Sequence, residues 1–364
     1  MNSTPFLTPL SVVREAGLKR LAQDKAAFLD ETAESLAAGP FRVTDKASPP
    51  PGGTLHDYWS LGPYWWPDPD KPNGLPYIRR DGHVNPESRG GGFDRTRLDG
   101  LAHAVNILLT AWAATGDAAH SNRIVFLLRA FFLDANTRMN PSLTYGQAIP
   151  GVCDGRGIGI IETTRLIDLL DAVVHLHHAG ACPDEDWNEL RKWIGDYLDW
   201  LLTSKHGREE RAAKNNHGTW MDAQLVAFAL FTGRTRLARE VAQDVPATRI
   251  DSQIAADGSQ PHELARTRPF MYSVFNLAAF ATLARLARHV GIDLWNHRGP
   301  QGQSIPSALD FLVPFAAGEK PWPYRQINET TGEERQELDP DALARFNTLA
   351  RRMDHCQSPT RRES

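Results

Sequence analysis

The feature that most constrains this chain is a succession of long segments with helical periodicity, each ended by a short polar break. Apolar residues recur in them every three or four positions, as on one face of an α-helix. Helices are expected over 98–115, 119–133, 157–178, 184–203, 217–232, 234–250, 269–290 and 304–315, with a weaker one over 340–353. Several breaks are short and contain Gly, as in Thr115-Gly116-Asp117 and Thr232-Gly233-Arg234. Such short connections predict antiparallel helix hairpins.

Helix hairpins joined by long irregular loops are what an (α/α) toroid or incomplete barrel requires. The sequence has no strict repeat of fixed period, which argues against a helical repeat array. It also has no predicted strand of more than a few residues and no shift in composition that marks a domain boundary. We therefore predict an all-α protein with residues 1–364 in a single catalytic domain, long loops on one rim and a frayed tail over 354–364.

The N-terminal part differs from the rest of the chain. A helical pattern covers 11–38 and ends at Ala38-Gly39-Pro40. A long stretch over 54–93 follows without regular periodicity and is rich in aromatic residues. Loops of this length are usually functional or disordered, and the density of aromatic rings argues against disorder. We predict a lid-like loop in which Tyr64, Trp65 and Trp66 line a groove, whereas Trp59 fits a core position equally well.

Net charge and apolar content limit the classes of binding partner and the cellular location that can be expected. The formal net charge of −4 argues against a general nucleic-acid surface. The sequence contains no run of eighteen apolar residues, so it does not predict a membrane-spanning helix. The first ten residues lack a charged segment followed by an apolar one, so the protein is cytoplasmic unless a signal was removed. The oligomeric state stays open.

Metal binding and disulfides are not expected from the spacing of cysteines and histidines. The three cysteines are widely separated, at Cys153, Cys182 and Cys356, so they form neither a disulfide framework nor a metal-ligand pattern. His175 and His178 share a helix end without carboxylate or Cys partners at ligand spacing. We interpret them as a polar helix C-terminus, where cationic groups are favoured.

Four residue types together fit one reaction, the β-elimination of a polyuronate. The carboxylate beside the acidic C5 proton must be neutralised, which donors in a preorganised site do. Asn216 offers an amide, His217 a ring N–H, and Arg266 a planar fork. Tyr272 can take the C5 proton and protonate O4 when both lie on one face of the sugar, provided that nearby cations lower its pKa from about 10. Taken singly, Asn216 fits a helix cap equally well, and the other three fit surface or core positions.

Asn216, His217, Arg266 and Tyr272 belong to a series of three motifs, and the order of these motifs makes the pattern specific. They are Tyr58-Trp59-Ser60-Leu61-Gly62-Pro63-Tyr64-Trp65-Trp66-Pro67-Asp68-Pro69, then Asn215-Asn216-His217-Gly218-Thr219-Trp220, then Asp257-Gly258-Ser259-Gln260-Pro261-His262-Glu263-Leu264-Ala265-Arg266-Thr267-Arg268 with Tyr272. Together they resemble the alginate-lyase superfamily from about residue 57 to 286. The likeness is greatest to polysaccharide lyase family 38, whose Arg-to-Tyr interval of six residues matches better than that of family 5.

The resemblance implies an (α/α) toroid, an aromatic lid and elimination without an obligatory metal or organic cofactor. Asn216 and Arg266 look like the carboxylate neutralisers, His217 like a neutraliser or the base of anti elimination, and Tyr272 like the acid and the syn base. The expected partner is an acidic polysaccharide, a β-1,4-linked polyuronate such as glucuronan or alginate. The residues expected to contact the substrate are Tyr64, Trp65, Trp66, Gln147, Arg165, His262, Glu263 and Arg268.

Two other functions fit the residues. An inverting glycoside hydrolase would need two carboxylates about 6.5–9.5 Å apart, and Asp257 with Glu263 is the obvious pair, with Asp154 a third candidate. A sugar-binding protein without catalytic activity is the second alternative. A lyase creates a C4–C5 double bond that absorbs in the near ultraviolet, which separates it from both.

Overall fold

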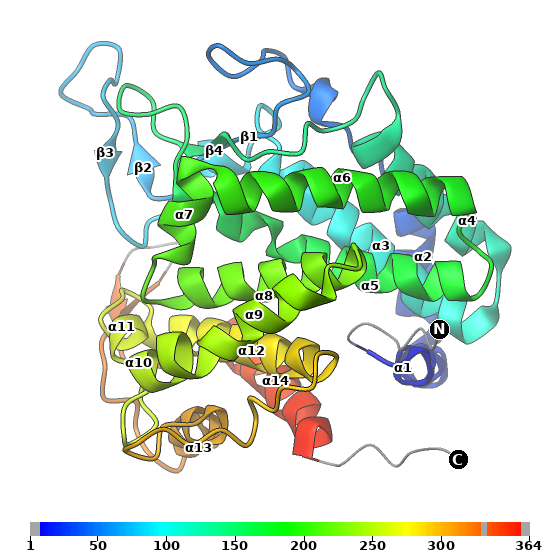
Figure 1. Ribbon diagram of the computed structural model, residues 1–364. Coiled ribbons are helices and arrows are strands. Elements are labelled where there is room, and N and C mark those ends of the chain that lie inside the picture. The colour runs from blue at the N-terminus through cyan, green and yellow to red at the C-terminus, as the bar shows by residue number, and fades with distance from the viewer. Residues whose placement is uncertain (1–7, 329–332, 358–364) are drawn as a thin grey trace. The chain divides into compact units, whose positions relative to one another are not determined.

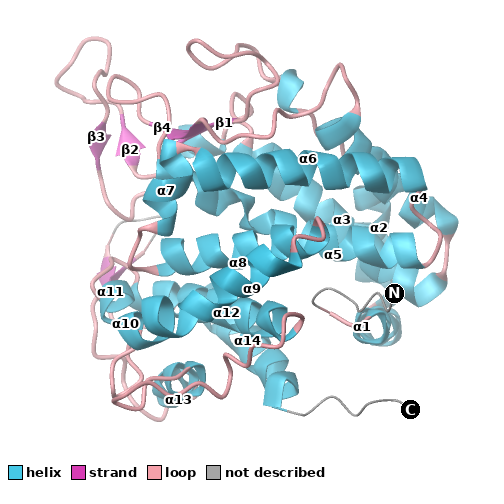
Figure 2. Cartoon of the chain, viewed as in Figure 1, coloured by secondary structure: helices cyan, strands magenta, loops and turns pink. Residues whose placement is uncertain are grey.

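A computed structural model describes residues 8–328 and 333–357. Figure 2 shows that helices dominate and that the strands are short. The α-helices are α1 Leu10–Gln23, α2 Lys25–Ala37, α3 Arg95–Thr115, α4 Ala118–Leu128, α5 Arg165–His178, α6 Asp184–Thr203, α7 Lys205–Arg211, α8 Asn216–Phe231, α9 Thr235–Val245, α10 Asp251–Gln253, α11 Pro261–Leu264, α12 Pro269–Arg288, α13 Ile305–Ala316 and α14 Pro340–Gln357. The strands are β1 Trp59–Leu61, β2 Trp65–Trp66, β3 Ile78–Arg79, β4 Tyr145–Ala148, β5 Gln326–Ile327 and β6 Glu334–Arg335.

Most predicted helices are present, and the differences have local causes. The segment predicted as one helix over 11–38 is two helices, broken at Asp24, whose φ of −148° and ψ of 60° are not helical. Aspartate competes for backbone hydrogen bonds and weakens a helix interior. The segment 157–178 begins as a 3₁₀ turn over Gly157–Thr164 before α5. The segment 234–250 ends in a π-helical turn at Pro246, which lacks the N–H that an α-helix needs.

At the C-terminus α14 continues to Gln357. The frayed tail predicted over 354–364 stays a prediction, and residues 358–364 lie outside the described residues. The short helices α7, α10 and α11 were not predicted, because three to seven residues carry too little periodicity to be recognised.

The chain divides into two compact units, residues 1–78 with 85–208, and residues 79–84 with 209–364. In the first unit α3 packs against α1, α2, α4 and α5. Strand β1 pairs with β4 in parallel, with Trp59 opposite Tyr145 and Leu61 opposite Ala148. The single catalytic domain predicted from the sequence stays a prediction.

In the second unit α12 is central. It packs against α8, α11, α13 and α14, and α8 also packs against α9, so that α9, α8 and α12 lie side by side (Figure 1). Of the described helices, only α12 has the length and apolar composition that could cross a membrane, and 67% of that stretch is buried. Such burial is typical of a core helix, and Tyr272 lies on the first turn of this helix.

Candidate active site

Hydrogen bonds fix the conformation of the turn before α8. Asn215 caps the helix, because its side chain accepts a hydrogen bond from the His217 N–H at 3.3 Å. Arg249 donates from Nη1 to the Ala213 carbonyl and from Nη2 to the Arg211 carbonyl, each at 2.7 Å. A Cβ at Gly218 would collide with the Ala213 carbonyl and with Arg249. The glycine therefore allows the close approach that places Asn216 and His217 on the first turn.

Asn216 is anchored by Glu263, although the two residues are 47 positions apart in the sequence. The backbone N–H of Asn216 donates to Glu263 Oε1 at 2.6 Å, and its side-chain Nδ2 donates to Oε2 at 2.8 Å. Burial raises the pKa of the Glu263 carboxyl, and the two hydrogen bonds from Asn216 oppose that rise. Because Asn215 provides the cap, Asn216 is not the capping residue, and its amide keeps a second N–H for another acceptor.

His217 contacts a second buried carboxylate. Its Nδ1 lies 2.7 Å from Glu210 Oε1, and the Glu210 side chain has no exposed surface. The His217 side chain keeps 16% of its surface exposed. Two consecutive residues, Asn216 and His217, are thus each hydrogen-bonded to a buried glutamate. Sequence analysis did not identify Glu210, because nothing in α7 distinguishes it from its solvated neighbour Glu209.

Arg266 and Tyr272 form the other half of the site. Arg266 Nη2 donates to the Tyr272 hydroxyl oxygen at 2.9 Å, and its guanidinium carbon lies 3.9 Å from the ring centroid. Tyr272 is 8% exposed, and Arg266 is half-buried. The charges of both Arg266 and His217 lower the pKa of Glu263, against the larger effect of burial. The Arg266 N–H also donates to the Glu263 carbonyl at 3.1 Å. Hydrogen bonds through Glu263 and Arg266 therefore link Asn216, which His217 follows directly, with Tyr272 in the second unit.

A buried network of amides, also not predicted, lies between the helices of this unit. Asn276 Nδ2 donates to Gln253 Oε1 at 3.0 Å and to Gln260 Oε1 at 2.8 Å. Thr219 donates to the same Gln253 oxygen at 3.0 Å, and Gln260 donates to the Ser273 carbonyl. These bonds tie α8, α10 and α12 together. Gln260 belongs to the third motif, and its buried hydrogen bonds give the amide at that position a structural role.

Three residues predicted to contact substrate also belong to the second unit. Glu263 is fully buried, and both its oxygens accept from Asn216. Arg268 is 9% exposed, and its Nη2 pairs with Asp339 at 3.1 Å. Their contacts with sugar stay predictions. His262 lies exposed on α11.

In the first unit, Tyr64, Trp65 and Trp66 are half-buried. Gln147 on β4 has φ of 49°, the one positive φ among the described non-glycine residues. Backbone in this strained region is concentrated at functional sites. Arg156 donates from Nε to the Gln147 carbonyl at 2.9 Å and from Nη2 to its side-chain oxygen at 3.1 Å.

Arg156 also connects the aromatic loop to this strand. Its guanidinium lies 5.9 Å from the Trp65 ring centroid and occupies the space that a Cβ at Gly62 would need. Arg156 was not among the residues predicted to contact substrate. Arg165, predicted to contact sugar, is exposed on α5 and pairs with Asp99 at 3.3 Å.

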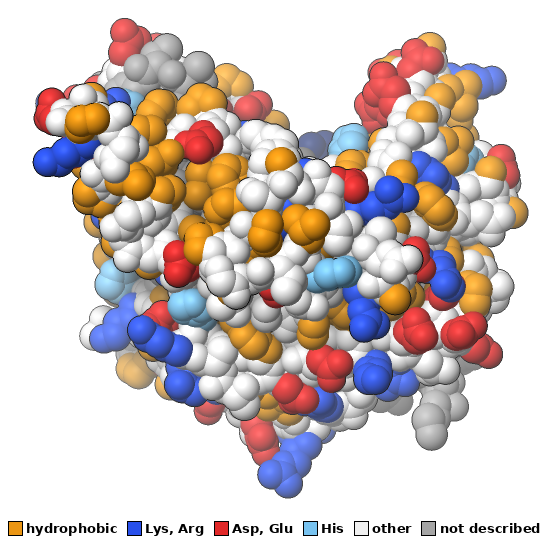
Figure 3. Space-filling model, turned by 90° about the horizontal axis from the view of Figure 1, so that it is seen from above, with side chains coloured by type: hydrophobic (Ala, Val, Ile, Leu, Met, Phe, Trp, Pro, Cys, Tyr) orange, Lys and Arg blue, Asp and Glu red, His pale blue; other side chains and the backbone are white. Residues whose placement is uncertain are grey.

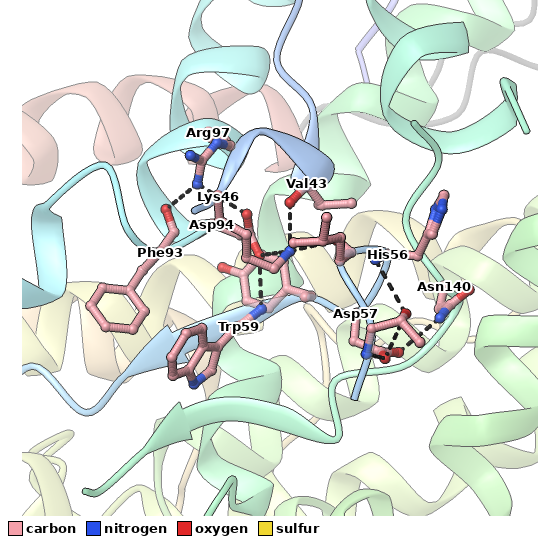
Figure 4. Close-up of polar contacts among 12 residues, drawn as sticks. Val43, Lys46, His56, Asp57, Trp59, Phe93, Asp94, Arg97 and Asn140 are labelled. Atoms are coloured by element: carbon pink, nitrogen blue, oxygen red, sulfur yellow. Dashed lines mark hydrogen bonds and ion pairs between the residues drawn. The ribbon is translucent and has the colours of Figure 1, made fainter. Parts of the chain in front are cut away.

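A buried ion pair anchors the start of the aromatic segment in the first unit (Figure 4). Lys46 Nζ contacts Asp94 Oδ2 at 2.9 Å, and neither side chain is exposed. The same oxygen accepts the Trp59 N–H at 2.9 Å, and Arg97 donates to the other oxygen at 3.1 Å. Burial lowers the pKa of Lys46 and raises that of Asp94. Trp59 packs edge-on against Phe93, with ring centroids 4.9 Å apart. Both the backbone and the ring of Trp59 therefore pack in the region of the Lys46–Asp94 ion pair.

Charges on the surface are mixed. On the face drawn in Figure 3, Lys and Arg side chains are interspersed with acidic and apolar ones. Within residues 8–328 and 333–357, no group of three or more His, Cys, Asp or Glu side chains is arranged to hold a metal ion.

Comparisons with known proteins identify the class of enzyme. A crystal structure of an alginate lyase from Bacteroides ovatus is 36% identical, with 97% of this chain and 92% of that chain covered and a TM-score of 0.86. Alginate lyase A1-III from Sphingomonas species A1 is 16% identical, with 87% and 79% covered and a TM-score of 0.55, which bears on the fold alone. The fold is the (α/α) toroid of these lyases, and the protein is a polysaccharide lyase.

The family follows from the sequence match. The family model described as alginate lyase matches residues 42–322. The chain therefore belongs to the alginate lyase family. A variant of A1-III complexed with a tetrasaccharide is also similar in fold, at 15% identity and a TM-score of 0.54, with 87% of this chain and 78% of that chain covered. A comparison with curated protein sequences found no significant match.

Proposed function

We propose that this lyase cleaves a β-1,4-linked polyuronate, glucuronan or the polymannuronate of alginate, and leaves 4,5-unsaturated uronate ends. The observation that carries the proposal is the gathering of Asn216, His217, Arg266 and Tyr272 around Glu263. A titratable phenol beside three donors is what β-elimination next to a carboxylate needs. The match of residues 42–322 to the alginate lyase family model supports a polyuronate as the substrate class.

The first step is neutralisation of the substrate carboxylate. Asn216 is suited to it because Glu263 takes one of its two amide hydrogens and leaves the other available. Arg266 has further N–H groups beyond the one on the Tyr272 oxygen. Donors fixed in this way cost little reorganisation when charge develops on the carboxylate during the reaction.

The second step is proton transfer and bond cleavage. In β-glucuronate and β-mannuronate, H5 and O4 lie on the same face of the ring, so Tyr272 can serve both. As phenolate it takes H5, the C5–H electron pair becomes the C4–C5 double bond, and the C4–O4 bond breaks with its electrons on O4. The same phenol then returns the proton to O4. Arg266, at 2.9 Å from the phenolic oxygen, stabilises the phenolate form.

The positions of Glu263 and Asp257 argue against the alternative of an inverting glycoside hydrolase. An inverting hydrolase needs both carboxylates at the scissile bond. Glu263 has no exposed surface and is occupied by Asn216. Asp257 lies exposed and accepts the Ser259 N–H at 2.9 Å in a turn.

Purified protein incubated with glucuronan, polymannuronate, polyguluronate and hyaluronan tests the proposal. We expect near-ultraviolet absorbance to grow with at least one of the first two. Tyr272→Phe should abolish that growth while oligosaccharide binding, measured by calorimetry, persists. Wild-type protein that is silent on all four polymers would overturn the substrate proposal.

A further inference from the structure

The contact between Glu210 and His217 fixes which ring nitrogen carries the proton. An ionised carboxylate only accepts hydrogen bonds, so a Glu210 oxygen 2.7 Å from Nδ1 requires an Nδ1–H donor. Neutral His217 then has a bare lone pair on Nε2. Nε2 becomes a donor only when the ring is protonated. The protonation state alone therefore decides whether His217 accepts a proton or donates one.

Glu210 is specialised for this contact. Its side chain has no exposed surface, and its second oxygen is buried without a hydrogen-bond partner among the described residues. A buried carboxylate so poorly solvated favours a cation beside it. Glu210 from α7 contacts the His217 ring, and Glu263 from α11 binds the preceding residue, Asn216. Of these, only Glu210 has a hydrogen bond to the ring in the described structure.

We propose that Glu210 is a positioning residue that holds His217 in the Nδ1–H tautomer. Nε2 is then the reactive nitrogen, which accepts a proton in the neutral ring and donates to the uronate carboxylate in the protonated ring. This assignment rests on the proposed lyase function for its chemical meaning. The tautomer itself does not depend on that function.

Nuclear magnetic resonance of protein labelled with ¹⁵N at histidine tests the tautomer directly. Long-range proton–nitrogen correlations of the ring, assigned with His217→Asn, distinguish a bare Nε2 from a bare Nδ1. We expect a protonated Nδ1 and a bare Nε2 in neutral His217, and loss of this fixed tautomer in Glu210→Leu, which has no acceptor. Wild-type protein with a bare Nδ1 would overturn the proposal, as would an unchanged tautomer in folded Glu210→Leu.

Kinetics on a cleaved polyuronate give the second readout. In Glu210→Gln we expect kcat to fall by about 10²-fold or more with KM nearly unchanged, as when a catalytic histidine loses the group that orients it. The limb of the pH–rate profile that reports the titration of His217 should move to lower pH, because the charge that favours the protonated ring is gone. Glu209→Gln, an exposed neighbour on the same helix, should match wild type.

The outcomes separate the two proposals. A wild-type profile in Glu210→Gln would overturn the role of Glu210 whatever the polymer. If no polyuronate is cleaved but the resonances show the predicted tautomer, the substrate proposal fails and the positioning role stands. Should Glu210→Gln not fold, the wild-type tautomer still decides.

Discussion

Arg266 contacts Tyr272 in two ways at once: its Nη2 donates to the phenolic oxygen at 2.9 Å, and its guanidinium plane lies over the ring, 3.9 Å from the centroid. The six-residue interval between them spans the break between α11 and α12. The pair therefore delivers a cation to the oxygen that would carry negative charge as phenolate. A lysine could supply the charge but neither the fork nor the flat surface.

Arg266→Lys should lower kcat/KM by about 10²–10³-fold, the cost of losing one donor aimed at developing charge. Thermal unfolding should change little, because Arg266 is only half-buried. Arg268→Lys is the matched comparison. Its guanidinium pairs with Asp339 in a nearly buried position, so it should lower the unfolding temperature while activity stays within a few-fold of wild type. The prediction fails if Arg268→Lys loses activity and Arg266→Lys loses only stability.

Glu263→Gln replaces an acceptor oxygen with an NH₂ that faces a donor of Asn216. One buried N–H then lacks a partner, which costs about 1–3 kcal/mol of unfolding free energy. Because Asn216 would no longer be fixed, kcat/KM should fall by about 10²-fold. Chemical denaturation and initial rates measure the two effects. Glu319→Gln, at an exposed position of the same unit, should have neither, and an active Glu263→Gln would exclude the anchoring role.

Lys46→Met should destabilise the protein by about 3 kcal/mol or more, because it leaves Asp94 buried with its charge incompletely paired. Asp94 still accepts from Trp59 and Arg97, so the structure around β1 should persist at low temperature. Lys25→Met, at an exposed position on α2, should be within about 0.5 kcal/mol of wild type. The double variant Lys46→Met with Asp94→Asn should be less destabilised than the sum of the single variants, and strict additivity would contradict a direct pairing.

His175 predicts a loss of stability at acid pH. Its Nε2 lies 2.8 Å from the Thr8 carbonyl, and burial lowers its pKa. The unfolded chain therefore binds a proton more readily than the folded one, so stability is fully present above about pH 6.5 and falls as the pH drops toward the lowered value. His175→Gln keeps a donor without the titration. The difference in unfolding free energy between the two proteins should shift with pH in favour of the variant on acidification; a constant difference would refute the assignment.

Much of the fold follows from local patterns. The bounds of α6 agree with the predicted 184–203, and α3, α8, α12 and α13 agree to within three residues at either end. Periodicity and short polar breaks are properties of neighbouring residues, so they are readable without tertiary contacts. The motif with Asn216, His217, Arg266 and Tyr272 was likewise visible, because its residue types have few other reasons to occur in that order.

Burial of charge was decided only by the tertiary structure. Glu263 was predicted at the substrate and is hydrogen-bonded to Asn216, Arg268 was predicted there and pairs with Asp339, and Glu210 was not predicted at all. A glutamate in a helix has the same local signature whether water or another side chain neutralises it. Distant segments packing together choose between these outcomes, since an ionised group loses its hydration only when they close around it. The sequence by itself thus determined most helices and the candidate reactive groups, and the tertiary structure determined which carboxylates contact those groups.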